Sequence, residues 1–296
     1  MSRPLFTSLE REERYTTLLQ WEFVPERRVE LQHNEYPEFL ETLDRLKWGA
    51  IASPHDKFDP EVVQEFYANA YPPEEGGEVV EHKSWVRGKV IRYDRDYLNM
   101  MLNNPYEKRD GHPDGYHLKM ANTHTMTHGF NNDETAGLLC IPGRSYSANI
   151  DGRPKRIYRK DMTTLAQIWM IFLLHNVIPN SHVSSLPLFV YYLIYSILAR
   201  VEINVAQLMA AKIYKTAVKC GKKGTMGFPS LITSLCARQG VQVNPTKPIK
   251  KLITKQYIKQ NCKKDNVEPH GQQPSQESQQ QHQQQQHFTL SRSWTA

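Results

Sequence analysis

Two rows of lysine side chains in the last third of the chain have the type and spacing to bind anions. Within each row the lysines are three or four residues apart, so each row would share one face of a helix. The rows are Lys212, Lys215, Lys219 and Lys222, then Lys251, Lys255, Lys259 and Lys263. No Asp or Glu occurs between Ile203 and Lys264, where thirteen residues are Lys or Arg. Clustered cations of this kind bind nucleic-acid phosphates.

We therefore predict that this segment contacts DNA or RNA. The candidate residues are Lys212, Lys215, Lys219, Lys222, Lys223, Lys250, Lys251, Lys255 and Lys259. Tyr214 and Tyr257 could stack on bases. A further basic patch, which could extend the surface, contains Arg153, Lys155, Arg156, Arg159 and Lys160. The plainer alternative is that the lysines are ordinary solvated faces of amphipathic helices, with Ile213 and Ile258 turned inward.

The charge of the chain is unevenly distributed. The net charge is +6, but the first 202 residues hold 23 basic and 28 acidic residues, a net charge of −5. All of the excess positive charge therefore lies in the acid-free segment. Its partner would be a nucleic acid, an acidic protein, or the acidic N-terminal part of the same chain.

Carboxylates are the candidates for catalysis. A transposase or integrase needs three of them converging on metal ions, and the candidates are Asp94, Asp96, Asp133, Asp151 and Asp161. Simpler roles account for several acids: Asp59, Asp94 and Asp161 precede predicted helices and would cap them, and Asp151-Gly152 is a typical turn pair. We assign no catalytic residue.

Other motifs of enzymes and metal proteins are missing. His112, His117, His124 and His128 fall in one polar loop without a nearby cysteine, which favours a solvated loop over a zinc site. The four cysteines form no CxxC pair, as expected for free thiols. The sequence has no GxxxxGK[ST] phosphate loop and no GxSxG elbow. We identify no cofactor, no metal site and no small-molecule substrate.

The hydrophobic spacing predicts mostly helices. We expect them at 8–20, 35–48, 59–71, 94–103, 132–139, 203–219, 229–238 and 251–262. Hairpins are expected around Arg87-Gly88 and Asp151-Gly152. Residues 104–131, rich in Gly, His, Asn and Thr, are expected to form an extended loop.

The segment from Met162 to Ala199 contains no formally charged residue. Its two apolar pieces, 168–178 and 186–199, are shorter than the roughly 18–20 residues that a membrane-spanning helix needs. We therefore expect two buried core helices, with no membrane contact. The predicted fold is mainly α (α+β), one domain over 10–262 with two small β-hairpins. A flexible segment (1–9) precedes it, and a disordered Gln-rich tail (263–296) follows it.

Six sequence blocks carry a family resemblance. They lie at 36–39, 58–72, 84–94, 161–179, 227–236 and 245–258, for example FDPEVVQEFYANAYP and SWVRGKVIRYD. In this order they resemble the "putative plant transposon protein" domain family of plant mobile elements. The resemblance implies a transposon- or retrotransposon-derived protein and transfers no functional residue.

Three functions stay open. The first is a non-enzymatic protein that binds nucleic acid or self-associates through the basic segment. The second is a degenerate metal-dependent transposase, and the third is a protein–protein interaction module. Met1 to Gln20 lacks an apolar run behind a basic start, so an intracellular location is expected. The pairs Lys222-Lys223 and Lys250-Lys251 suggest the nucleus.

Overall fold

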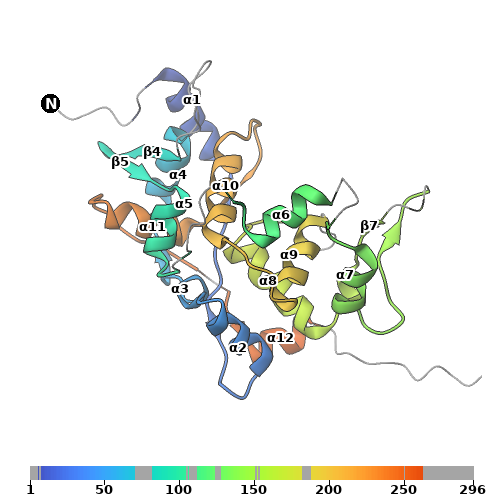
Figure 1. Cartoon of the computed structure of the whole chain (residues 1–296). Helices are drawn as coiled ribbons and strands as arrows, with labels where there is room; N and C mark the ends of the chain where they lie inside the picture. Colours follow the sequence, from blue (N-terminus) through green and yellow to red (C-terminus); the bar gives the residue numbers. More distant parts are fainter. Residues whose placement is uncertain are drawn as a thin grey trace, which may run out of the picture. The chain divides into compact units, whose positions relative to one another are not determined.

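The structure, a computed structural model, describes residues 6, 8–70, 82–104, 106, 112–123, 128–150, 152, 154–181, 188–249 and 251–262. Within these residues the chain is mainly helical, with twelve α-helices and five two-stranded sheets (Figure 1). The predicted fold class is therefore confirmed. The predicted tail over 263–296 and residues 1–5 and 7 of the predicted N-terminal segment lie outside the described residues.

The helices follow the hydrophobic spacing of the sequence. They are α1 (Leu9–Leu18), α2 (Pro37–Arg45), α3 (Gly49–Ala52), α4 (Pro60–Asn69), α5 (Arg95–Met101), α6 (Gly115–Asn122), α7 (Asn132–Leu139), α8 (Thr164–Asn176), α9 (Leu188–Leu198), α10 (Val205–Ala217), α11 (Pro229–Arg238) and α12 (Lys255–Asn261). Side-chain caps define most of their starts, because the first N–H groups of a helix have no partner within it. Asp59 caps α4 and Asp94 caps α5, as predicted.

The prediction that Asp161 caps a helix is wrong. Thr163 is the cap of α8, and its hydroxyl accepts from Ala166 N. Asp161 ends a 3-10 turn, and its carbonyl accepts from Ile141 N at 2.9 Å. The bridge between Cys140 and Met162 keeps the chain extended there, so the helix begins two residues later than the acid suggests.

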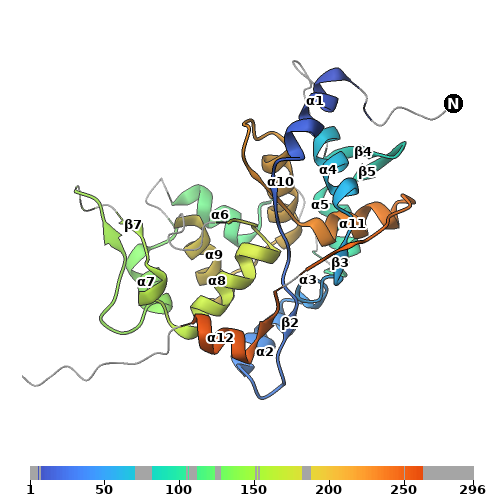
Figure 2. The same ribbon diagram turned by 180° about the vertical axis from the view of Figure 1, so that it is seen from behind.

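Helices α8 and α9 form the buried centre, as predicted. Every residue of α8 from Ala166 to Leu174 is buried, and α8 packs against α2, α3 and α9 (Figure 2). An aromatic cluster holds α2 to α8, with the ring centroids of Phe39 and Trp169 4.7 Å apart. Among the described residues, no helix has both the length and the apolar character to cross a membrane.

Both predicted hairpins are present. They are β4 (Lys83–Val86) with β5 (Lys89–Arg92), and β6 (Ser147–Ala148) with β7 (Pro154–Arg156). In the first, Arg87 and Gly88 both have positive φ, as a type I′ turn requires.

Three further pairings join segments that are distant in sequence. Strands β1 (Glu22–Val24) and β8 (Thr225–Gly227) pair in parallel, as do β2 (Val29–Glu30) and β10 (Ile253–Thr254). Strand β3 (Lys57–Phe58) pairs antiparallel with β9 (Lys247–Pro248). These pairings bring the first 60 residues against the last 40 described ones, and segments of two or three residues carry no period that could predict them.

The expected extended loop over 104–131 is wrong in part, because it contains α6. Asp114 starts this helix: its carboxylate accepts from His117 N at 2.7 Å and from Asn204 N at 2.6 Å. Burial alone would raise the pKa of Asp114, but the hydrogen bonds from His117 and Asn204 outweigh it and lower that pKa. A cap that is also held by a distant segment overrides the weak helix propensity of the loop.

Candidate nucleic-acid interface

Helix α10 carries Lys212 and Lys215 of the first lysine row, and Lys219 follows just after its C-cap, Val218. Ile213 and Ala217 of this helix are buried, while Lys215 and Lys219 are exposed and Lys212 is half-buried. Burial lowers the pKa of Lys212, and the nearby charges of Lys215 and Lys219 lower it further. The three ammonium groups therefore lie within electrostatic reach of one another, as the spacing predicts.

The loop after α10 adds Lys222 and Lys223, both exposed. Trp21 fixes this loop, because its indole Nε1 donates to Gly221 O at 3.3 Å. A Cβ atom on Gly224 would lie 2.7 Å from the same indole, so the close approach requires glycine. We call Lys212, Lys215, Lys219, Lys222 and Lys223 the α10 surface.

The charge of the α10 surface is not neutralised by the described part of the chain. No described carboxylate lies within 4.0 Å of the ammonium groups of Lys215, Lys219, Lys222 or Lys223. The Lys219 ammonium lies 5.5 Å from the ring centroid of Trp21, which also receives the Arg14 guanidinium at 4.6 Å. Two cations on a buried ring raise the local positive charge further.

Helix α12 carries only Lys255 and Lys259 of the second lysine row, and part of their charge is neutralised. The predicted helix over 251–262 is wrong at its start, because β10 occupies Ile253–Thr254, so Lys251 precedes the helix; Lys263 lies outside the described residues. Lys251, Lys255 and Lys259 are exposed, but the Lys255 ammonium lies 3.1 Å from the Glu35 carboxylate. Hydrogen bonds from the Gln32 N–H and from Lys255, with the charge of Lys259, lower the pKa of Glu35. Lys250 lies outside the described residues. Helices α10 and α12 are not side by side in either view, so the two rows are separate surfaces (Figures 1 and 2).

The other predicted contacts are tied to neighbours. Tyr214 makes an edge contact with His82 at 6.0 Å between ring centroids, and Tyr257 covers the guanidinium of Arg27. In the further basic patch Arg159 donates to Asn261 O at 2.6 Å, and Arg153 lies outside the described residues. Base stacking by the two tyrosines stays a prediction.

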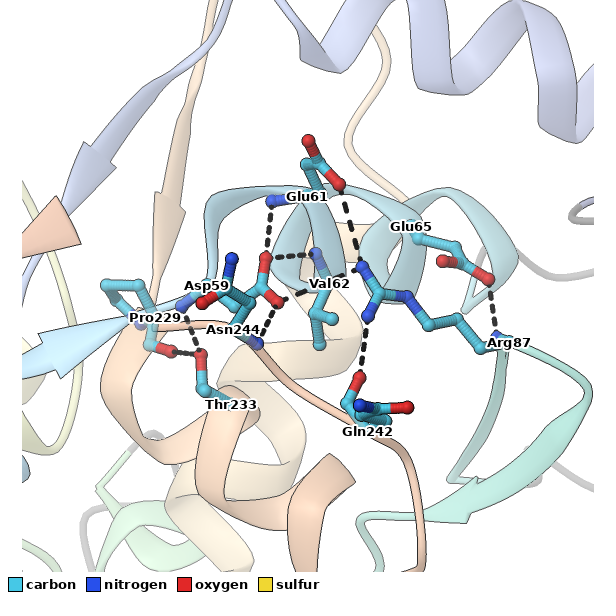
Figure 3. Close-up of polar contacts among 9 residues, drawn as sticks. All are labelled: Asp59, Glu61, Val62, Glu65, Arg87, Pro229, Thr233, Gln242 and Asn244. Carbon is cyan, nitrogen blue, oxygen red and sulfur yellow. Dashed lines mark hydrogen bonds and ion pairs between the residues drawn. The ribbon is translucent and has the colours of Figure 1, made fainter. Parts of the chain in front are cut away.

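Asp59 has a structural environment. Its carboxylate accepts from Glu61 N at 3.1 Å, Val62 N at 3.2 Å and Asn244 N at 2.8 Å (Figure 3). Its own backbone N–H donates to the Thr233 hydroxyl at 3.0 Å. Asp59 thus joins the start of α4 to α11 through its backbone N–H, and to Asn244 in the segment after α11 through its carboxylate.

Arg87, in the turn of the first hairpin, completes this network. Its guanidinium lies 3.8 Å from the Asp59 carboxylate and 3.6 Å from that of Glu61, and it donates to Gln242 O at 2.6 Å (Figure 3). Its backbone N–H donates to Glu65 at 2.6 Å. The network fastens the hairpin to α4, so these acids have defined roles in packing.

The remaining predicted acids and histidines do not converge in the described structure. Among those residues, no three His, Cys, Asp or Glu side chains are placed to hold a metal ion. Asp94 pairs with Arg92 at 2.9 Å, and His117 with Asp114 at 2.8 Å. His124 and Asp151 lie outside the described residues.

A cavity of about 750 Å³ was not anticipated from the sequence. Glu26 and Asn176 lie on its wall, with the helix start at Ser230 and Leu231. The Glu26 carboxylate accepts from Ser230 N at 3.0 Å and Leu231 N at 2.7 Å, so it caps α11 from a distant segment. Burial raises the pKa of Glu26 to about 7, although these hydrogen bonds oppose the rise. A glutamate far from the helix it caps leaves no local sequence signal.

Comparison with known families identifies the chain. A family model described as "putative plant retrotransposon-related domain" matches residues 44–242, about two thirds of the chain. The chain belongs to this family. The match confirms the resemblance inferred from the sequence blocks, four of which lie inside it. No curated protein and no solved structure matches this plant retrotransposon-related chain.

Proposed function

We propose that this plant retrotransposon-related protein is non-enzymatic and binds DNA or RNA through the α10 surface. The observation that carries the proposal is the exposed, unneutralised group of lysines on α10 and the loop after it. A nucleic-acid backbone presents phosphates at regular intervals, and a row of lysines on a fixed helix face can neutralise several at once. Contacts of this kind carry no base preference.

The α10 surface is a better candidate than α12. Lys255 of α12 already pairs with Glu35, and binding a phosphate there would compete with that pair. The α10 lysines have no such competitor among the described carboxylates. The loop that carries Lys222 is held by Trp21, so little ordering would be needed on binding.

The test is a fluorescence-anisotropy titration of the full chain with short DNA and RNA over a salt series. If about four phosphates are contacted, the affinity should fall about 100-fold between about 50 and 200 mM salt. Replacing Lys215, Lys219, Lys222 and Lys223 by Gln should weaken binding at least about tenfold at low salt and flatten the salt dependence. All four side chains are exposed, so folding should be unaffected.

The control variant replaces four exposed lysines elsewhere: Lys47, Lys57, Lys83 and Lys89. It removes the same total charge, so a general charge effect would weaken both variants equally. Equal weakening, or no binding by the folded parent protein at low salt, would overturn the proposal. A role through a protein partner or through self-association would then be the better account.

A further inference from the structure

Arg27 is buried and rigidly held between β1 and β2. Its backbone N–H donates to Asn176 Oδ1 at 3.0 Å, and Asn176 Nδ2 donates to Arg27 O at 2.8 Å. The residue is only 6% exposed. Its guanidinium carbon lies 4.6 Å from the ring centroid of Tyr257, which the pairing of β2 with β10 brings over it.

The positive charge of Arg27 has no counter-ion in the described structure. No described carboxylate pairs with Arg27, and its Nε and Nη1 atoms are buried without a hydrogen-bond partner. Burial lowers the pKa of the guanidinium, the Tyr257 phenol opposes this, and the charge of Arg159 lowers it further. A buried guanidinium with unused N–H groups is costly unless an anion satisfies it.

Other cations surround the same place. The Nε of Arg159 is also buried without a partner, while its Nη2 donates to Asn261 O at the end of α12. Burial lowers the pKa of His175 to about 3, and the charges of Arg27 and Lys251 contribute to this shift. His175 is therefore neutral at pH 7, and its Nδ1 lies 3.1 Å from Pro25 O, where it can donate. Three permanent cations, Arg27, Arg159 and Lys251, remain.

We propose that Arg27, Arg159 and Lys251 form a binding site for a phosphate group, with Tyr257 as its movable cover. Guanidinium groups bind phosphate through paired N–H donors, and these two have donors to spare. Tyr257 lies on a helix of seven residues, and its side chain is only half-buried. A shift of its ring would open Arg27 to an anion. The group could be free phosphate or a backbone phosphate of a nucleic acid.

This site is separate from the α10 surface, so the two proposals can fail independently. The α10 surface consists of five lysines, four of them exposed, that would contact successive phosphates of a nucleic-acid backbone. The Arg27 site offers the paired N–H donors of a buried guanidinium group, which would hold one phosphate in fixed geometry. The α10 variant can be tested for phosphate binding, and the Arg27 variant can be tested for nucleic-acid binding.

The experiment is thermal unfolding of the full chain with inorganic phosphate or pyrophosphate, against chloride at equal ionic strength. Saturating phosphate should raise the Tm of the parent protein by about 2 to 4 °C or more. Arg27→Met should give no phosphate response. Its Tm in chloride should equal or exceed that of the parent, because an unpaired buried charge is replaced by an apolar side chain of similar length.

Two further variants keep the test decisive. Arg27→Lys keeps the charge but lacks the paired N–H donors of a guanidinium group, so it should bind phosphate at least about tenfold more weakly. Lys89→Met removes one exposed charge elsewhere and should respond like the parent protein. No phosphate response in the parent protein, or an equal response in Arg27→Met, would overturn the site. A large loss of stability in Arg27→Met in chloride would also overturn it, because Arg27 would then be a packing residue.

Oligonucleotide binding by Arg27→Met distinguishes free phosphate from a backbone phosphate of a nucleic acid as the ligand. If Arg27→Met also binds a single-stranded oligonucleotide more weakly, the site takes a backbone phosphate. If oligonucleotide binding is unchanged while the phosphate response is lost, the site takes free phosphate or a small phosphorylated compound. The α10 variant should keep its phosphate response in both cases.

Discussion

At the scale of single residues, exposed charges were easier to predict than buried ones. The lysine rows follow from spacing alone, and α10 carries Lys212 and Lys215 of the first row, with Lys219 directly after it. The roles of Glu26 and Arg27 could not be predicted from the residues next to them in the sequence. Glu26 contacts the start of α11, and Arg27 contacts the ring of Tyr257, and both partners are more than 200 residues away. Burial of a charge is a property of the fold, so the sequence could not reveal it.

The raised pKa of Glu26 predicts a specific pH dependence of stability. The folded-state pKa of about 7 exceeds the ordinary glutamate value of 4.5, so the folded state holds the proton more tightly. This contribution to stability is complete below about pH 4.5 and is lost as the pH rises through about 7. The free energy of unfolding should therefore fall by up to about 3 kcal/mol over this range from Glu26 alone.

Urea unfolding of the parent protein and Glu26→Gln at pH 4.5, 6 and 8 measures this effect. Glutamine does not titrate, so the difference between the two proteins should shrink or change sign as the pH rises. Glu22→Gln is the matched control, because Glu22 is an exposed carboxylate four residues earlier. The same pH dependence in the parent protein and Glu26→Gln would contradict the raised pKa.

At the scale of elements, local signals predicted helices well where a cap and an apolar face agree. The sequence Asp59-Pro60 begins α4, and Asp94 begins α5. The signals failed at α6, where the composition indicates a loop but a distant segment stabilises the helix start. They also failed for β1, β2 and β3, whose pairings depend on segments about 190 to 220 residues away.

The position of Asp114 predicts that its cap is worth more than an ordinary one. Asp114→Ala removes the acceptor for His117 N and leaves the Asn204 N–H buried without a partner. The expected loss is about 2 to 4 kcal/mol of unfolding free energy. Asp94→Ala removes a cap that serves only its own helix start and an exposed ion pair, so about 1 kcal/mol is expected.

Chemical denaturation of both variants at pH 7 gives the comparison. The m-value should stay unchanged, since neither substitution alters the surface exposed on unfolding. Equal losses in the two variants would mean that the Asn204 contact adds nothing. The formation of α6 would then need another explanation, such as the hydrogen bond from Tyr116 N to Glu202 O.

At the scale of the whole molecule, the two ends of the described chain stabilise its middle. Strands β1 and β2 pair with β8 and β10, and Glu26 caps α11. Phe39 of α2 is fully buried against Trp169 of α8. The family match begins only at residue 44 and ends at 242, so it omits α1, β1, β2, all but the last two residues of α2, β9, β10 and α12. The segment matched by the family model is therefore shorter than the segment that packs into the folded domain.

This difference predicts that a fragment limited to residues 44–242 does not fold cooperatively. The fragment would leave the N–H groups of Ser230 and Leu231 without their carboxylate, and it would expose the α8 surface that Phe39 covers. Removing one buried Phe side chain costs about 3 to 5 kcal/mol, which alone is a large part of the stability of an average domain. We expect the fragment to give a broad urea transition. Dispersed amide signals are expected only from the full chain. Supplying residues 8–43 as a separate peptide should restore part of the structure if the lost contacts are the cause. A sharp urea transition of the fragment alone, with an m-value in proportion to its length, would contradict this prediction. Residues 44–242 would then contain a core that is stable by itself, and the pairings of the terminal strands would only add to its stability.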